Sequence, residues 1–232
     1  MKTRTLIPLT FVPLFFAALS ASALDLVNIK NFDPTIEVEL RYATTRNVTG
    51  HALYPPNMPA LIRPSVAQQL VIAQNYLQAR GLRLKIWDAY RPKMAHDQLW
   101  QFLPNRDFVA NPTDGGSLHT WGVAVDATLV YSNGHAVEMP TDFDEFTPAT
   151  MLQYAGTNGN VRDHLHTLQR AMARAGFYGM RNEWWHFVSK DWKKFTSADT
   201  SEISAASPQP LTSSTRPPTA DNPASHRTRA TR

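Results

Sequence analysis

The sequence predicts an α+β fold, in which a single compact domain has a central antiparallel sheet with helices packed on it. Residues 82–87 and 123–130 alternate between the two faces that a strand presents, which is typical of half-buried strands. Residues 65–80 and 160–176 instead place apolar side chains at helical spacing. A turn signal at 132–134 directly follows the second strand and favours a hairpin between antiparallel neighbours.

Three segments of different composition divide the chain into a leader at 1–23, a domain at 24–196 and a tail at 197–232. The leader begins with Lys2 and Arg4 and continues as an apolar run that ends in small residues. This pattern is typical of a cleaved secretory signal peptide, and the run is short for a membrane span, although a plain membrane anchor is the alternative. We therefore expect an exported protein, most simply a periplasmic one, with no stable membrane span after cleavage.

The tail and the charge balance limit what the protein can do. Residues 197–232 are rich in Ser, Thr, Pro and Ala, so they cannot bury a core and are expected to be disordered. The formal net charge is +4, but the leader and the tail supply most of it and leave about +1 on the domain. This balance predicts no basic patch and no nucleic acid partner. The absence of cysteine rules out disulfides and thiolate metal ligands.

For the first half of the domain, the sequence predicts strands at 26–29 and 36–40, followed by a loop at 45–64. A helix at 65–80, a strand at 82–87 and a short helix through 96–99 come next. Gly81 is the stop signal of the first helix. Pro92 keeps Arg91 extended, so the second helix begins after it. His96 is expected on the surface of that second helix.

For the second half of the domain, the sequence predicts a loop at 105–117, a strand at 123–130 and a hairpin return strand at 136–139. An irregular segment at 143–159 is expected to cover the cleft, and a helix from 160 and a strand at 184–188 follow it. Alternation along the first strand puts Val123 and Val125 on one face and Asp126 on the other. Asn160 is the expected N-cap of the helix, and Gly176 is its stop.

Two short motifs contain residue types that bind divalent metal ions. The first, at 116–126, contains His119 and Asp126, and the second contains Glu183 and His186. A catalytic zinc ion takes three protein ligands of nitrogen or oxygen type and keeps one position open. Since the chain has no cysteine, His119, Asp126 and His186 form a suitable set for a hard or borderline divalent ion. His119 and Asp126 alone could equally form a structural hydrogen-bonded pair.

Glu183 is a candidate general base for an attacking water molecule, because it lies three residues before His186. Three residues are an odd step along a strand, so the two side chains would point to opposite faces. Both reach one site only if Glu183 lies just before the strand, in the turn at 180–182. Gly122 is expected to let the backbone bend close to the ion.

The residues of these motifs resemble the VanX-type D-alanyl-D-alanine dipeptidases, zinc peptidases of the bacterial cell wall. The family pattern is Ser-x-His-x-x-Gly-x-Ala-x-Asp, followed later by Glu-x-x-His. It is matched in order by these positions: Ser117, His119, Gly122, Ala124, Asp126, Glu183 and His186. The resemblance extends from residues 41–50 through 87–93 to about Trp192.

The resemblance implies that three residues hold one zinc ion: His119, Asp126 and His186. It implies that Glu183 is the base. It also implies that Arg91 stabilises the charge that develops on the scissile carbonyl oxygen, as a fixed guanidinium can. On the residues alone, the alternative for Arg91 is a structural ion pair with Asp88.

The resemblance further implies two residues that contact the substrate. Asp144 receives the free amino group of the substrate, and Ser117 is a polar contact. The alternative for Asp144 is a solvated acidic loop, because Asp142 and Glu145 lie beside it. The chain departs from the family pattern at 120–121, where Thr and Trp replace Ser and Arg; this departure leaves the metal ligands intact and leaves the shape and charge of the pocket wall open.

Together these features predict zinc-dependent hydrolysis of the D-alanyl-D-alanine dipeptide, a small partner, in cell-wall peptide turnover or glycopeptide resistance. A zinc D,D-carboxypeptidase or endopeptidase that acts on longer muropeptides is the alternative within the same chemistry. A non-catalytic zinc-dependent binding module is a more remote alternative. Glu183 and Arg91 speak against that module, since binding alone needs neither.

Overall fold

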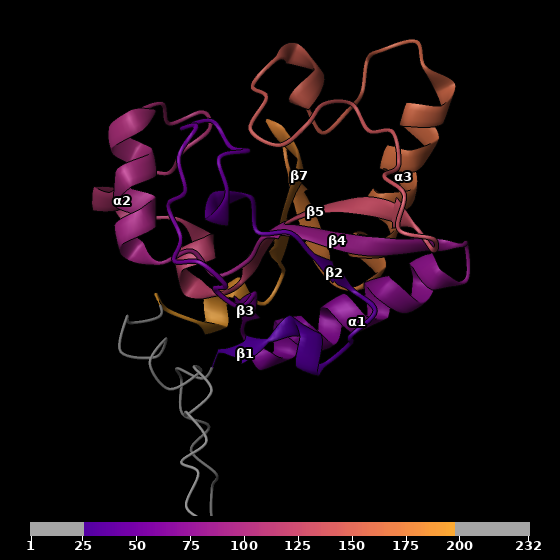
Figure 1. Cartoon of the computed structure of the whole chain (residues 1–232), viewed down its shortest axis with the longest axis horizontal. Coiled ribbons are helices and arrows are strands. Elements are labelled where there is room, and N and C mark those ends of the chain that lie inside the picture. Colours follow the sequence, from indigo (N-terminus) through magenta and orange to yellow (C-terminus); the bar gives the residue numbers. More distant parts are fainter. Residues whose placement is uncertain (1–25, 198–232) are drawn as a thin grey trace, which may run out of the picture.

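The computed structural model describes residues 26–197 of the 232-residue chain (Figure 1). The expected signal at 1–23 and the expected tail beyond Ser197 lie outside the described residues. Within the described part, no helix is both long enough and apolar enough to cross a bilayer. The described part contains almost all of the domain predicted at 24–196.

A five-stranded sheet forms the centre of the domain and confirms the predicted α+β fold (Figure 1). From one edge to the other, its strands are β2 (Glu37–Val38), β4 (Leu82–Asp88), β5 (Ala124–Tyr131), β7 (Glu183–Ser189) and β6 (Phe177–Met180). All neighbours are antiparallel except β2, which runs parallel to β4. Two further strands, β1 (Val27–Asn28) and β3 (Leu61–Ile62), pair with each other outside this sheet.

Two helices pack together against the sheet, and a third lies apart from them (Figure 1). They are α1 (Pro64–Gln78), α3 (Gly159–Arg174) and, apart, α2 (Lys93–Phe102). Along β4, the fully buried Leu84 and Ile86 alternate with the partly exposed Arg83 and Lys85. The helices therefore cover the apolar face of β4, and the opposite face is left for polar side chains.

The expected return strand at 136–139 is wrong, although the turn before it is present. Gly134 adopts a φ of 87°, but only one bridge, from Val130 to Ala136, joins the returning chain to β5. The other end of this edge of β5, from Ala124 to Asp126, is paired with β7. The chain then leaves the sheet, and a hydrogen bond ties the Glu138 carbonyl to α3.

The start of α3 also differs from the prediction. Asn158, rather than Asn160, is the N-cap, because its side-chain oxygen accepts hydrogen bonds from the N–H groups of Asn160 and Val161. Gly176 follows the helix as predicted, with a φ of 90°. The chain enters β6 at once with Phe177, and this strand was not predicted from the sequence.

Candidate active site

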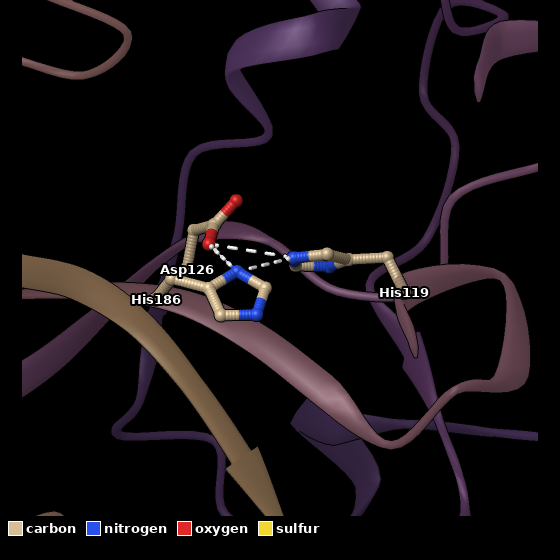
Figure 2. Close-up of side chains that lie close together, drawn as sticks. All are labelled: His119, Asp126 and His186. Carbon is tan, nitrogen blue, oxygen red and sulfur yellow. Dashed lines mark hydrogen bonds and ion pairs between the residues drawn. The ribbon is translucent and has the colours of Figure 1, made fainter. Parts of the chain in front are cut away.

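The three predicted metal ligands come together from three separate segments (Figure 2). Asp126 of β5 and His186 of β7 are direct partners in the antiparallel register, so their side chains leave the same face of the sheet side by side. His119 lies in a 3-10 turn just before β5 and points to the same place. All three side chains are buried.

The ligand atoms lie at separations that suit one metal ion. His119 Nε2 is 3.1 Å from His186 Nδ1 and 3.4 Å from Asp126 Oδ1. His186 Nδ1 and Asp126 Oδ1 are 3.0 Å apart. Tetrahedral zinc with bonds of about 2.0–2.1 Å would place its ligand atoms about 3.3 Å apart. The donor types and their spacing therefore fit zinc. Among residues 26–197, this is the one group of three such side chains.

Hydrogen bonding and backbone geometry fix the ring of His119. Its Nδ1 lies 2.8 Å from the Ala89 carbonyl oxygen, which can only accept, so Nδ1 carries the proton and Nε2 presents its lone pair. Gly122 ends the turn with a φ of 67°, and a Cβ there would lie 2.6 Å from Leu26 Cδ2. Gly122 is thus required by the turn and by packing on Leu26.

Glu183 reaches the same site because β7 is irregular at its start. Glu183 is the first residue of β7, and the pairing with β6 shifts register beside Met180. This irregularity, of the β-bulge kind, removes the strict alternation, so Glu183 and His186 line one cavity. Glu183 Oε2 lies 3.8 Å from His186 Nδ1. Burial raises the pKa of Glu183 well above its ordinary value, and nearby carboxylates raise it further.

Arg91 lies on the wall of this cavity and is held there by Asp88. Its Nε and Nη2 donate to Asp88 Oδ2 at 3.0 and 2.8 Å, and Nη2 is 3.8 Å from Asp126 Oδ2. Its guanidinium carbon lies 4.8 Å from the centre of the Tyr42 ring. The other Asp88 oxygen accepts a hydrogen bond from the Tyr54 hydroxyl. The two alternatives for Arg91 are therefore compatible, because the ion pair orients a cation that faces the cavity.

Asp144 is buried, although its acidic neighbours are exposed. Asp144 is 8% exposed, and its carboxylate accepts hydrogen bonds from the Tyr42 hydroxyl at 3.3 Å and the Val48 N–H at 3.2 Å. Its φ of 57° is a left-handed conformation that a non-glycine residue rarely adopts. Burial raises the pKa of Asp144 to about 7, against the hydrogen bond from Val48, which lowers it. The solvated-loop alternative is wrong for this residue.

Ser117 lines the cavity and also caps the turn that carries His119. Its Oγ accepts a hydrogen bond from the His119 N–H at 3.2 Å. Thr120 and Trp121, where the chain departs from the family pattern, are not among the residues that line the cavity. Trp121 packs instead near Trp192, with ring centres 6.0 Å apart.

One cavity of about 280 Å³ is lined by all of the predicted site residues: Arg91, Ser117, His119, Asp126, Asp144, Glu183 and His186. Two contacts join the segments around it. Phe108 stacks on Phe146 with ring centres 4.3 Å apart, and the Asn182 side chain donates to the Asp107 carbonyl at 2.9 Å. Pockets for drug-sized molecules hold roughly 300–1,000 Å³, so this cavity suits a smaller substrate.

Several residues around the site were given no catalytic or binding role from the sequence. Tyr42 and Asp88 lie inside residues 41–50 and 87–93, the two further segments that carry the family resemblance. Their place in these segments could have marked them as candidate site residues. Tyr54 lies in the proline-rich loop and carries no such signal. His96 was expected on a helix surface but is buried, with its Nε2 2.9 Å from the Ala110 carbonyl oxygen. Burial lowers the pKa of His96 to about 4.

Comparisons with known proteins match most of the chain. A sequence model of the Peptidase M15 family, described as D-ala-D-ala dipeptidase, matches residues 22–201. The D-alanyl-D-alanine dipeptidase of Escherichia coli K12 is 33% identical over 163 residues, which cover 70% of this chain and 83% of that protein. The D-alanyl-D-alanine dipeptidase of Enterococcus faecium is 27% identical over 172 residues, which cover 66% of this chain and 85% of that protein.

Two solved structures show weaker likeness. A mutant of the vancomycin resistance D,D-pentapeptidase VanY in complex with Zn(II) aligns with a TM-score of 0.37 at 16% identity, over 61% of this chain and 81% of that one. The LD-carboxypeptidase LdcB aligns with a TM-score of 0.40 at 19% identity, over 73% of this chain and 71% of that one.

Proposed function

The chain belongs to the Peptidase M15 family of D-ala-D-ala dipeptidases, and from this membership we propose that it hydrolyses the D-alanyl-D-alanine dipeptide with one zinc ion as cofactor. The observation that carries the proposal is a single small cavity that combines a three-ligand metal cluster with a carboxyl group, a fixed cation and a buried acid. The proposal includes export to the periplasm, supported by the signal-like leader, and a role in cell-wall peptide turnover or glycopeptide resistance.

The metal cluster supplies the proposed zinc site. His119 Nε2, His186 Nδ1 and Asp126 Oδ1 would hold the ion, and the hydrogen bond from His119 to Ala89 keeps the ligating nitrogen deprotonated. When bound, zinc supplies Lewis acidity, which makes water easier to deprotonate and the scissile carbonyl easier to attack. The fit is to one ion per chain, because the described residues form one such cluster.

Glu183 moves the proton in the proposed reaction. Its carboxylate takes a proton from the attacking water as the water oxygen bonds to the carbonyl carbon. When the C–N bond breaks, Glu183 gives that proton to the departing amine nitrogen, and two alanine molecules result. The raised pKa of Glu183 suits a group that must both take and return a proton. Arg91, oriented by Asp88, faces the negative charge that develops on the carbonyl oxygen.

Asp144 is proposed to select the dipeptide. A free dipeptide carries an ammonium group close to the scissile bond, and a pocket that excludes water must pair that charge. Asp144 lines the same small cavity as the metal ligands, and Tyr42 and Val48 already orient its two oxygens. A longer peptide would place uncharged chain, rather than an ammonium, against this acid.

Asp144→Ala should lower kcat/KM for D-alanyl-D-alanine about 30-fold or more, because truncating one member of a buried charged pair costs roughly 2–5 kcal/mol. N-acetyl-D-alanyl-D-alanine has no ammonium to pair, so the parent should strongly reject it. The measurement is the ratio of kcat/KM values for the free and N-acetylated dipeptides, in the zinc-loaded parent and variant.

Asp163→Ala is a matched control, since Asp163 is exposed on α3 and lies outside the cavity. This control removes the same charge and should leave both rates unchanged. If the parent cleaves the N-acetylated dipeptide as readily as the free one, the site is not built around an amino terminus. The D,D-carboxypeptidase or endopeptidase alternative would then replace the dipeptidase.

A further inference from the structure

Arg41 forms an ion pair with Asp142 outside the cavity of the metal ligands. Its Nη2 donates to Asp142 Oδ1 at 2.8 Å and its Nη1 to Asp142 Oδ2 at 3.4 Å, so two nitrogens hold both oxygens. Arg41 is 4% exposed, and its guanidinium carbon lies 4.9 Å from the centre of the Trp87 ring. Arg41 and Asp142 line a separate groove with Trp87 and Thr128, and neither lines the cavity of the metal ligands. Arg41 therefore does not touch a substrate in that cavity.

This ion pair stands beside a second contact that does reach the cavity. Arg41 and Tyr42 are consecutive residues, and Asp142 and Asp144 lie on either side of Phe143. Arg41 binds Asp142, whereas Tyr42 donates to Asp144 at 3.3 Å. Phe143 is buried, with its ring centre 5.3 Å from that of Tyr42. The same two short segments are thus joined twice, once outside the cavity and once by residues that line it.

Asp144 depends on such support because its backbone is in a sparsely populated conformation. A non-glycine residue with a φ of 57° keeps that conformation only where its surroundings fix it. Asp142 fixes the neighbouring backbone, since its Oδ1 accepts the Phe143 N–H at 2.8 Å and its own N–H donates to Glu145 Oε2 at 2.9 Å. Arg41 is the buried partner that holds Asp142 in place.

We propose that Arg41 is a positioning residue for recognition of the substrate amine: by holding Asp142, it keeps Asp144 where the ammonium group binds. The inference rests on the proposed function, in which Asp144 receives that group. Arg41 acts through the Asp142 carboxylate and the backbone of Phe143. Its contribution should therefore appear only with substrates that carry a free ammonium.

Arg41→Met should lower kcat/KM for D-alanyl-D-alanine roughly 10- to 100-fold, because a shift of about 1 Å in a positioned group costs up to that much. The loss should lie mainly in KM, and the zinc content should stay that of the parent. The rate on the N-acetylated dipeptide should not change, so the preference for the free dipeptide should fall by the same factor. Arg41→Lys keeps the charge but not the two-nitrogen contact and should give an intermediate preference.

Arg46→Met is the matched control for loss of charge from the same network. Arg41 Nε also lies 3.2 Å from Glu39 Oε1, so Glu39, Arg41 and Asp142 form one network of ion pairs. Arg46 is 60% exposed and lies 2.7 Å from Glu39 and 3.8 Å from Asp142, so it belongs to this network without being buried in it. Its removal should leave the preference within about twofold of the parent, as expected for an exposed ion pair. Asp142→Asn changes the exposed partner of the Arg41–Asp142 ion pair and leaves Arg41 in place. It should lower the preference for the free dipeptide as Arg41→Met does.

A double variant separates positioning from a general structural role. If Arg41 acts only through Asp144, Arg41→Met combined with Asp144→Ala should be no worse on the free dipeptide than Asp144→Ala alone. The inference is overturned if the losses in kcat/KM from the two substitutions are fully additive, or if Arg41→Met lowers kcat/KM equally for the free and N-acetylated dipeptides. It is also overturned if the Arg41→Met and Asp142→Asn proteins keep the parent's preference for the free dipeptide. The proposed function fails separately, when the parent itself shows no preference for the free dipeptide.

Discussion

Glu183→Gln is expected to lower kcat by roughly 10²–10⁴-fold while zinc and the dipeptide still bind. The amide has nearly the shape of the carboxyl group, but it cannot take a proton at neutral pH. Glu183 Oε2 lies 3.8 Å from His186 Nδ1 and is not a member of the ligand cluster, so the metal site keeps its three ligands. Single-turnover kinetics on zinc-loaded protein, with the zinc content measured by elemental analysis, isolates the chemical step.

Glu138→Gln makes the same chemical change at an exposed residue outside the cavity and should keep the turnover of the parent. Glu183→Asp is a second comparison, because it keeps the carboxyl group but withdraws it by one methylene. Its rate should fall between those of Glu183→Gln and the parent. Turnover of zinc-loaded Glu183→Gln within a few-fold of the parent would show that another group moves the proton.

His119→Ala, Asp126→Ala and His186→Ala should each lose stoichiometric zinc, and turnover with it. The three ligand atoms lie within 4.8 Å of one another, so removing any one leaves two protein ligands where a catalytic zinc site has three. Elemental analysis after dialysis measures the loss directly. A ligand that binds only the folded state stabilises it by about 4 kcal/mol at 1,000 times its Kd, so zinc should raise the thermal midpoint of the metal-free parent but not of the variants.

His166→Ala is the control for these three variants, since His166 is exposed on α3 and outside the cluster. It should bind zinc and gain thermal stability as the parent does. Full zinc occupancy in one of the three ligand variants would remove that residue from the ligand set. Full occupancy in all three would place the metal elsewhere in the chain.

The chemistry of the site could be predicted from the sequence, whereas the contacts that fix the site could not. The spacing of the two motifs and the family resemblance identified residues that line one cavity. Both depend only on the types of residues and their order, which the sequence gives directly. The supporting contacts join distant segments. Tyr54 donates to Asp88 across 34 positions, and Arg41 binds Asp142 across 101. No local pattern encodes such pairs.

The position of Glu183 relative to His186 shows how a sound local rule can fail. Strict alternation puts the two side chains on opposite faces of a strand, and the register shift between β6 and β7 cancels that alternation. The shift is a property of the strand pair. The partner strand β6 has four residues and includes Gly179, so its own signal in the sequence is weak.

The spread of the proposed metal ligands along the chain would make tight zinc binding depend on folding. His186 lies 60 positions beyond Asp126, and it reaches the other ligands only after β7 has paired with β5. Pairing between such distant segments must first close a long loop and is slow compared with helix formation. A chain that has not completed this step offers two of the three ligands and holds zinc only weakly. Tight zinc binding at the proposed site would therefore require the pairing of β5 with β7 and would follow a late step in folding.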